Sequence, residues 1–284
     1  MINLLALIDG SGYSKSVCDH AAWFASRLGG SVEIVHVLGR QDLSSHSEDF
    51  SGNIGIGART ALLEGLAELD AQKARLSQKR GRAILDDARK SVVASGVAKV
   101  TTKLRLGEIV ETLQDLEAEA DMIVIGKRGE GAGFNQLHLG SNLERVVRSS
   151  HKPVLLASRA FKPVRRFLVA YDGGQSAIKA IDEIARNKVF ADLDCELLCV
   201  GTETAKAEAQ MEASANQLRT AGYRVKTKFM PGRPETVIAG EIETDAYDLM
   251  VMGAFGHSVI RNLIIGSTTT EMIRSCKIPL LLFR

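Results

Sequence analysis

Glycines and hydroxyl residues gather near the end of the chain, in GAFGHSVIRNLIIGSTTT (253–270). Gly253 and Gly256 leave an apolar run typical of a strand, and Gly266 directly precedes a helical pattern. A glycine at a strand end lets the backbone approach a ligand, and one before a helix opens backbone N–H groups to an anion. Hydroxyl donors follow at Ser267, Thr268 and Thr269. The stretch predicts a phosphate-binding loop; the alternative is a glycine-rich turn before a well-capped helix.

Other sets of chemically active residues are not apparent. The chain has no GxxxxGK[ST] loop, no G-x-S-x-G and no H-E-x-x-H, and its six histidines lack metal-ligand spacing. Cys195 and Cys199 share one face of a probable strand, where we expect buried apolar thiols and not metal ligands. We therefore predict neither catalytic residues nor a metal site. Without a positioned base, at most slow hydrolysis of a nucleotide is expected.

The chain repeats itself, and the repeats carry these residues. Asp9 and Asp172 each close an apolar run and lie 163 residues apart, while Gly140 and Gly266 lie 126 apart. The order of matching segments is the same in both halves, which indicates a tandem duplication. We predict a first domain at 1–157 and a second at 166–284. The first contains 37 extra residues (163 − 126), within an insert at about 40–95.

Each half alternates predicted strands with predicted helices. The strands are expected at 2–8, 31–37, 99–105, 121–126 and 153–157, and at 166–171, 194–200, 224–230, 247–253 and 279–283. Several are nearly continuous apolar runs, which are typical of parallel sheets covered on both faces. The pattern predicts two doubly wound parallel-sheet α/β domains, in which ligands bind beyond the carboxyl ends of the strands.

The insert contains a charged helical pattern from about 58 to 95. Four leucines fall on one stripe of it: Leu62, Leu66, Leu69 and Leu76. We interpret the stripe as a packing face, with a partner-binding helix as the alternative.

Composition excludes some classes of function. The net charge of +2 provides no basic surface for nucleic acid or a membrane, and no apolar run reaches the length of a membrane span. The N-terminus lacks the basic region of a signal peptide. We expect a soluble, cytoplasmic protein.

The second half resembles the universal stress protein family. Its Gly253, Gly256, Gly266 and Ser267 match the family's nucleotide-binding signature G-x2-G-x9-G-[ST] after the fourth strand. The Asp that closes the first strand and the closing strands KPVLL and KIPLLL also fit, in order and in both halves. The resemblance covers nearly the whole chain apart from the insert.

The resemblance implies a flavodoxin-like domain with strand order 3-2-1-4-5 that binds ATP, with Mg²⁺ bridging the phosphates. By the same resemblance, the base end of the nucleotide would meet Ala170, Asp172 and Val200. The remainder would lie along Met252, Gly253, Gly256, Gly266, Ser267, Thr268 and Thr269. It further implies that the last strands of the two domains pair antiparallel within one chain; a homodimer remains open.

The first half departs from this pattern. Ten residues, not nine, separate Gly129 from Gly140, and Asn142 stands at a threonine position. Lys127 and Arg128 are basic and could assist phosphate binding. A site in the first half would use Asp9, Gly126, Gly129, Gly140 and Ser141. We expect binding mainly in the second half, with the first half vacant or holding another ligand.

The function indicated is a nucleotide-sensing, regulatory role in stress response, with an unidentified protein partner. The alternatives are an interaction module that binds no nucleotide and, less favoured, a slow nucleotide hydrolase.

Overall fold

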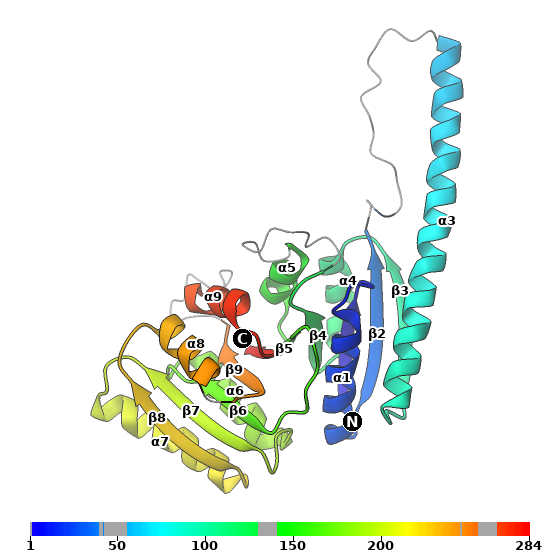
Figure 1. Cartoon of the computed structure of the whole chain (residues 1–284). Helices are drawn as coiled ribbons and strands as arrows, with labels where there is room; N and C mark the ends of the chain where they lie inside the picture. Colours follow the sequence, from blue (N-terminus) through cyan, green and yellow to red (C-terminus); the bar gives the residue numbers. More distant parts are fainter. Residues whose placement is uncertain (1, 40–41, 43–55, 130–140, 245, 255–265) are drawn as a thin grey trace.

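The computed structural model describes residues 2–39, 42, 56–129, 141–244, 246–254 and 266–284 (Figure 1). The first half contains β1 Asn3–Ile8, α1 Ser14–Leu28, β2 Ser31–Leu38, α3 Ile56–Ala94, β3 Val100–Leu106, α4 Ile109–Leu116, the 3-10 helix η1 Glu117–Glu119, β4 Met122–Gly126, α5 Ser141–Ser149 and β5 Val154–Ala157. The second half contains β6 Arg166–Ala170, α6 Gln175–Asn187, β7 Asp194–Val200, α7 Ala205–Thr220, β8 Arg224–Met230, α8 Pro234–Thr244, β9 Leu249–Gly253, α9 Ser267–Ser275 and β10 Leu280–Phe283. The strands lie within one or two residues of the predicted ranges.

All these strands form one sheet, in the order β3-β2-β1-β4-β5-β10-β9-β6-β7-β8. If the strands of each half are numbered from one to five in chain order, each half reads 3-2-1-4-5 from the outer edge of the sheet to its centre, as predicted. Neighbours are parallel except β5 and β10, which pair antiparallel with Leu155 opposite Leu281. This pairing confirms that the last strands join the two halves within one chain. The domain boundaries at 157 and 166 remain a prediction.

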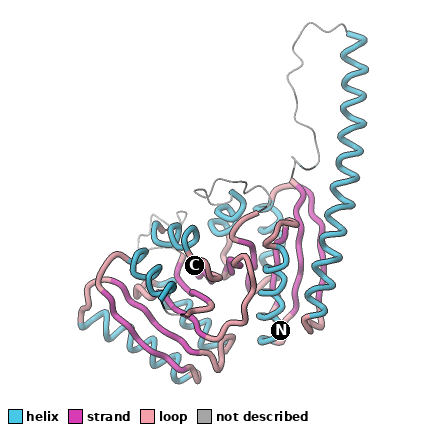
Figure 2. The backbone as a smooth tube through the Cα atoms, viewed as in Figure 1, coloured by secondary structure: helices cyan, strands magenta, loops and turns pink. Residues whose placement is uncertain are grey.

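Helices cover both faces of the sheet (Figure 2). One core cluster packs α1, α3, α6 and α7 against one face, and a second packs α4, α5, α8 and α9 against the other. The apolar strands explain this arrangement, because a strand without polar alternation must be buried on both sides. The predicted doubly wound fold is confirmed.

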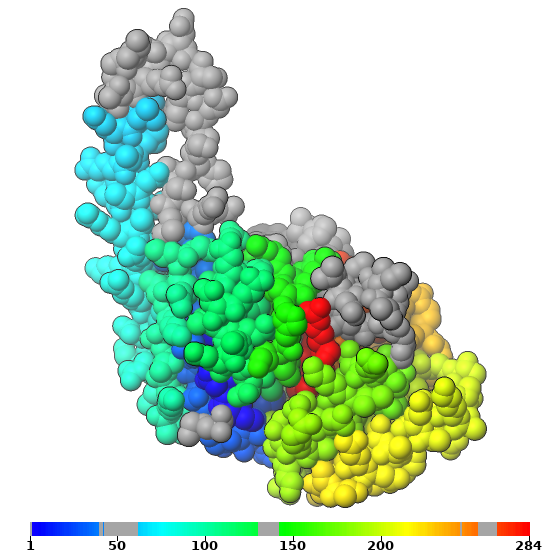
Figure 3. Space-filling model, turned by 180° about the vertical axis from the view of Figure 1, so that it is seen from behind, coloured from blue at the N-terminus to red at the C-terminus, as the bar shows by residue number. Residues whose placement is uncertain are grey.

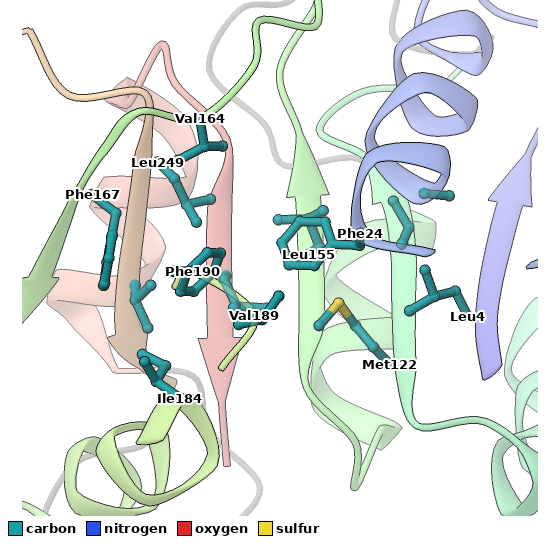
Figure 4. Close-up of a cluster of buried hydrophobic side chains, with 14 of the residues drawn as sticks. Leu4, Phe24, Met122, Leu155, Val164, Phe167, Ile184, Val189, Phe190 and Leu249 are labelled. Carbon is teal, nitrogen blue, oxygen red and sulfur yellow. The ribbon is translucent and has the colours of Figure 1, made fainter. Parts of the chain in front are cut away.

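The first core cluster runs across the junction between the halves (Figure 4). Phe190 contacts Phe24 from the first half edge-on, with ring centroids 5.8 Å apart, and lies 4.7 Å from Phe167. The Arg27 guanidinium donates to the Val189 carbonyl at 2.8 Å. Apolar packing and polar contacts therefore join the halves beyond the β5–β10 pair.

The insert lengthens one helix. After the insert, matching residues of the two halves lie 126 apart, so Ala205, the first residue of α7, corresponds to position 79 (205 − 126). Helix α3 nevertheless begins at Ile56, which is 23 residues before position 79 (79 − 56). The extra residues, 56–78, project beyond the carboxyl ends of β2 and β3 (Figure 1). The predicted packing is wrong for Leu69 and Leu76, which are 59% and 68% exposed because this part of α3 extends past the sheet, whereas Leu62 and Leu66 are half-buried. No helix in the described ranges is both long and apolar enough to cross a membrane.

Candidate functional site

The carboxyl ends of β6, β7 and β9 meet at one edge of the sheet in the second half. Ala170 at the end of β6 lies between Leu198 of β7 and Met252 of β9 in the strand register. Ala170 and Val200 pack against the same core cluster that contains Met252, so all three lie on one face of the sheet. The structure therefore brings Ala170 and Val200, predicted to meet the base, together with Met252, predicted to lie along the rest of the nucleotide.

Asp172 lies two residues beyond β6, at the same edge. Its Oδ1 accepts a hydrogen bond from the Gly174 N–H at 2.8 Å. Gly173 between them has φ of 70°, a conformation that favours glycine. The Asp-Gly-Gly turn thus holds an exposed carboxylate beside the apolar residues.

The N-terminus of α9 supplies donors for an anion. Gly266 is the N-cap residue, and the first N–H that bonds within the helix is that of Thr270, to the Gly266 carbonyl at 2.9 Å. The N–H groups of the preceding residues have no acceptor within a helix. Ser267 is exposed and Thr268 is half-buried. Backbone donors, hydroxyl groups and the helix dipole together form an environment that suits phosphate.

The glycines of this site serve different purposes. A Cβ on Gly253 would lie 2.9 Å from the Ser176 Cβ and 3.3 Å from the Ala177 nitrogen, so glycine is needed there for α6 to pack on β9. Among the residues that the structure describes, a Cβ on Gly266 would meet only the Thr269 Oγ1, at an ordinary 3.6 Å. No described neighbour therefore requires glycine at 266, unlike at 253.

Thr269 has a structural contact that the sequence did not predict. Its side chain is 4% exposed, and its hydroxyl donates to the Gly253 carbonyl at 3.3 Å. The bond ties the first turn of α9 to the end of β9. Thr269 therefore positions the helix N-terminus against the strand. Gly256 lies outside the described residues.

Cys199 lies at this strand end but packs on the opposite face of the sheet from Val200, and the sequence analysis did not connect it with Asp172. It immediately precedes Val200 and is half-buried, whereas Cys18, Cys195 and Cys276 are buried. Burial raises the pKa of the Cys199 thiol, and the negative charge of Asp172 raises it further. The prediction of a fully buried thiol held for Cys195 and not for Cys199; alternation along the strand did not reveal its closeness to Asp172.

The first half has a matching turn with different contacts. Asp9 Oδ1 accepts from the Ser11 N–H at 3.0 Å, and a Cβ on Gly129 would lie 2.7 Å from Asp9 Oδ2. A Cβ on Gly126 would lie 2.8 Å from the Tyr13 Cβ, so this glycine, like Gly253, allows close helix packing. Ser141 begins α5, and Gly140 lies outside the described residues.

Side chains of the first half crowd its own strand ends. A Cβ on Gly10 would lie 2.6 Å from Ile84 Cδ1 of α3, whereas the equivalent Gly173 meets Gln210 Oε1 at 3.5 Å. His36, equivalent to Cys199, is 6% exposed, and its Nδ1 donates to the Ile8 carbonyl at 2.8 Å. The side chains beside the first turn are thus bulkier and more apolar than those beside the second turn.

Lys127 is directed away from any phosphate in the first half. Its ammonium group donates to the carbonyls of Cys276 and Ile278, at 2.5 and 2.7 Å, beyond the C-terminus of α9. Burial lowers the pKa of this amine. The suggestion that Lys127 assists phosphate binding is therefore wrong, because the side chain caps a helix of the other half.

Metal ligands are not clustered in the part of the chain that the structure describes. No group of three or more His, Cys, Asp or Glu side chains is placed to hold an ion there.

Comparisons with known proteins agree with this architecture. A sequence profile of the universal stress protein family matches residues 1–158 and 200–284. Universal stress protein Slr1230 of Synechocystis is 36% identical over 287 aligned residues, covering 100% of both chains. Universal stress protein MJ0531 of Methanocaldococcus jannaschii is 30% identical over 158 residues, covering 54% of this chain and 80% of that one. A crystal structure of a universal stress protein from Archaeoglobus fulgidus superposes with a TM-score of 0.73 at 20% identity, covering 99% and 98% of the two chains.

Proposed function

Because the chain belongs to the universal stress protein family, we propose that its second half binds ATP at the carboxyl ends of β6, β7 and β9. We assign residues 1–157 and 166–284 as the two domains and place the protein in the cytoplasm. ATP occupancy would report the energy state of a stressed cell to a regulatory protein partner.

The observation that carries this proposal is the N-terminus of α9. No residue in the described part of the chain lies close enough to require glycine at 266, so Gly266 is available for the approach of an anion. Ser267 and Thr268 lie on the first turn, where backbone N–H groups have no intrahelical partner. These groups suit the phosphates of a nucleotide. Gly256 would approach the same phosphates, and Thr269 would hold the helix against β9.

The base of the nucleotide would lie at the carboxyl ends of β6, β7 and β9, on the side away from the N-terminus of α9. Ala170, Val200 and Met252 offer an apolar surface on one face, and the Asp172 carboxylate can accept from the adenine amino group. The backbone at Gly253 would run beside the nucleotide. When bound, Mg²⁺ would neutralise phosphate charge, with water completing its shell.

We propose little or no hydrolysis. Hydrolysis needs a base that orients water near the terminal phosphate. The described polar side chains on the first turn of α9 are hydroxyls, which bind phosphate and are too weakly basic to activate water. Binding without turnover suits a sensor, because occupancy then follows the ATP concentration.

Titration of the full chain with MgATP by isothermal calorimetry tests the proposal. Gly266→Val should weaken binding about hundredfold or more, because its methyls obstruct several phosphate hydrogen bonds. Gly140→Val is the matched change in the first half and should leave the affinity unchanged. Unchanged affinity in Gly266→Val, or no binding by the unsubstituted protein, would refute the proposal. Thermal unfolding without ATP provides the folding control.

A further inference from the structure

A hollow lies at the junction between the two halves, beyond the carboxyl ends of β4 and β5. Its volume is about 310 Å³, at the lower end of the range for sites that hold small molecules. Its walls come from both halves: the segments after β4 and β5, the start of α1, and the end of α9. Figure 3 shows the halves in contact, with the C-terminal residues, in red, against the first half, in green. We call this hollow the junction pocket.

The described residues around the junction pocket carry positive charge and no negative charge. Five of them are cationic: Lys127, Arg128, Arg159, Arg274 and Lys277. Like charges gathered around one hollow repel one another, and the repulsion grows where water is partly excluded. An anion between them would remove this repulsion. The composition of the pocket therefore favours a negatively charged ligand.

Two of the arginines come from neighbouring strands. Gly126 pairs with Ala157 in the parallel register of β4 and β5, and an arginine follows each of them two residues later. The Lys127 N–H donates to the Ala157 carbonyl at 3.2 Å, which keeps the two segments together beyond the strands. Since neighbouring strands lie about 4.8 Å apart, Arg128 and Arg159 enter the same wall of the pocket.

The third arginine belongs to the other half, and Lys127 fixes the helix that carries it. Arg274 lies in the last turn of α9. The buried Lys127 ammonium group donates to the carbonyls of Cys276 and Ile278, just beyond this helix. The end of α9 is thereby held beside β4. Lys127 is a positioning residue, and the guanidinium groups are the ones that can meet a ligand.

The chain itself does not neutralise these three guanidinium groups. No carboxylate in the described ranges pairs with Arg128, Arg159 or Arg274. The planar fork of an arginine suits phosphate, because it can donate to two oxygens at once. Three forks can engage up to six oxygens, which is the number of terminal oxygens on a diphosphate and more than one phosphate group carries.

The matching place in the other half lacks this set, so the fold does not require it. Arg148 corresponds to Arg274 (274 − 126) and pairs with Glu144 of its own helix. Ala254 follows β9 where Lys127 follows β4. The two ends of the β5–β10 pair therefore differ in charge, although the same elements surround both.

We propose that the junction pocket binds an anion with two adjacent phosphate groups, either free or as part of a phosphate ester. This ligand would be distinct from the nucleotide. The proposed nucleotide phosphates lie at the N-terminus of α9, whereas Arg274 lies near its C-terminus, and nine residues of helix span about 13 Å. Asp9 and Ser141, expected to contact a nucleotide in the first half, are not among the described residues that line the pocket.

Calorimetric titration of the full chain with sodium pyrophosphate tests the proposal. One pyrophosphate per chain should bind in this pocket with a dissociation constant below about 100 µM, and orthophosphate should bind at least about tenfold more weakly. Gly266→Val obstructs the proposed nucleotide site and should leave this binding unchanged, so the two proposals can fail independently. Loss of pyrophosphate binding in Gly266→Val would place the anion at the N-terminus of α9 and overturn the proposal.

Arginine substitutions locate the binding. Arg128→Gln, Arg159→Gln and Arg274→Gln should each weaken pyrophosphate binding about tenfold or more, because each removes a charged donor. Arg148→Gln is the matched change in the other half and should leave the affinity unchanged. All three pocket arginines are exposed, so thermal unfolding without ligand should show the variants as stable as the unsubstituted protein.

The triple variant R128Q/R159Q/R274Q should not bind at about 5 mM pyrophosphate. In the Gly266→Val background, tighter binding of ADP than of pyrophosphate would identify an ester as the ligand, and the reverse order would identify free diphosphate. Three results would overturn the proposal: no binding by the unsubstituted protein, undiminished binding in the triple variant, or equal affinity for orthophosphate and pyrophosphate.

Discussion

The two Asp-Gly turns of this duplicated chain occupy matching positions, but the side chains beside them differ in size and polarity. In the first half, Ile84 of α3 presses against Gly10, and the His36 ring is buried at the neighbouring strand end. In the second half, the polar Gln210 lies beside Gly173 at ordinary distance, and the smaller Cys199 replaces the histidine. The scaffold is the same, but among the described residues those beside the first turn are bulkier and more apolar than those beside the second.

This comparison separates residues that the fold requires from residues that a ligand requires. Gly126 and Gly253 occupy the same position in both halves because a helix packs against each. Among the described residues, none packs closely enough against Gly266 to exclude a Cβ. Its match in the first half, Gly140, is also a glycine, so the sequence alone does not separate the two kinds of glycine.

The largest effect on stability should come from the packing glycines. Gly253→Ala places a Cβ 2.9 Å from the Ser176 Cβ and 3.3 Å from backbone, which should lower the free energy of unfolding by about 2–3 kcal/mol. Gly266→Ala should change it by less than about 0.5 kcal/mol. Urea denaturation without nucleotide measures both. Equal losses would contradict the division between packing and ligand glycines.

A somewhat smaller loss is expected at the junction. Lys127→Met removes a buried ammonium group that donates to the Cys276 and Ile278 carbonyls, and should cost about 2 kcal/mol. A similar contact runs in the other direction: Arg284 of the second half donates to the Arg148 and Ser150 carbonyls of the first half, at 3.3 and 3.2 Å. Arg284→Met should cost less, since these bonds are longer. The reverse ranking in urea unfolding would show that Lys127 does not secure the junction.

Two matched glutamates should differ in their response to acid. Burial alone would raise the pKa of Glu117, but hydrogen bonds from Ser150, His151 and Lys152 outweigh it and lower the pKa. A lowered pKa adds stability at neutral pH that disappears as the pH falls through the acidic range. Its counterpart, Glu243, forms an exposed ion pair with Lys277 at 3.4 Å.

Glu117→Gln should therefore cost about 1 kcal/mol at pH 7 and progressively less toward pH 4. Glu243→Gln should have almost no effect at either pH, as expected for exposed pairs. Unfolding of each variant by urea, in buffers spanning this range, measures the difference. A constant loss in Glu117→Gln at every pH would mean that its charge is not responsible.

The smallest expected effect is a change in thiol reactivity. Because burial and the Asp172 charge raise the pKa of Cys199, its reactive thiolate should be scarce near neutral pH. Asp172→Asn removes the charge, lowers this pKa and should accelerate alkylation a few-fold at pH 8. MgATP should slow alkylation of the unsubstituted protein. Mass spectrometry of Cys199, with buried Cys195 as an internal control, follows both rates.

The sequence predicts the scaffold well because the scaffold depends on local patterns. Continuous apolar runs located the strands, and the matching order of segments identified the duplication. The antiparallel β5–β10 pair, in turn, followed from family resemblance. Each of these signals lies within a few neighbouring residues or recurs along the chain.

Contacts between distant residues were not predictable in this way. Lys127 reaches carbonyls about 150 residues later in the chain, so its basic character alone suggested phosphate. The sequence does not show which atoms a side chain at a glycine position would contact. Whether Gly253 serves packing or ligand binding therefore cannot be decided until the position of Ser176 is known. Periodicity revealed the leucine stripe of α3 but not that Leu69 and Leu76 lie beyond the end of the sheet.

The number of nucleotides bound per chain tests the difference between the halves most directly. Equilibrium dialysis against saturating MgATP would give this number for the unsubstituted protein and for Gly266→Val. We predict about one nucleotide per chain in the former and almost none in the latter, since the described residues beside the second turn are less bulky than those beside the first, and Gly266 precedes a helix N-terminus that suits phosphate. Two per chain, with one retained in Gly266→Val, would contradict the account, because the crowded first half would then also bind.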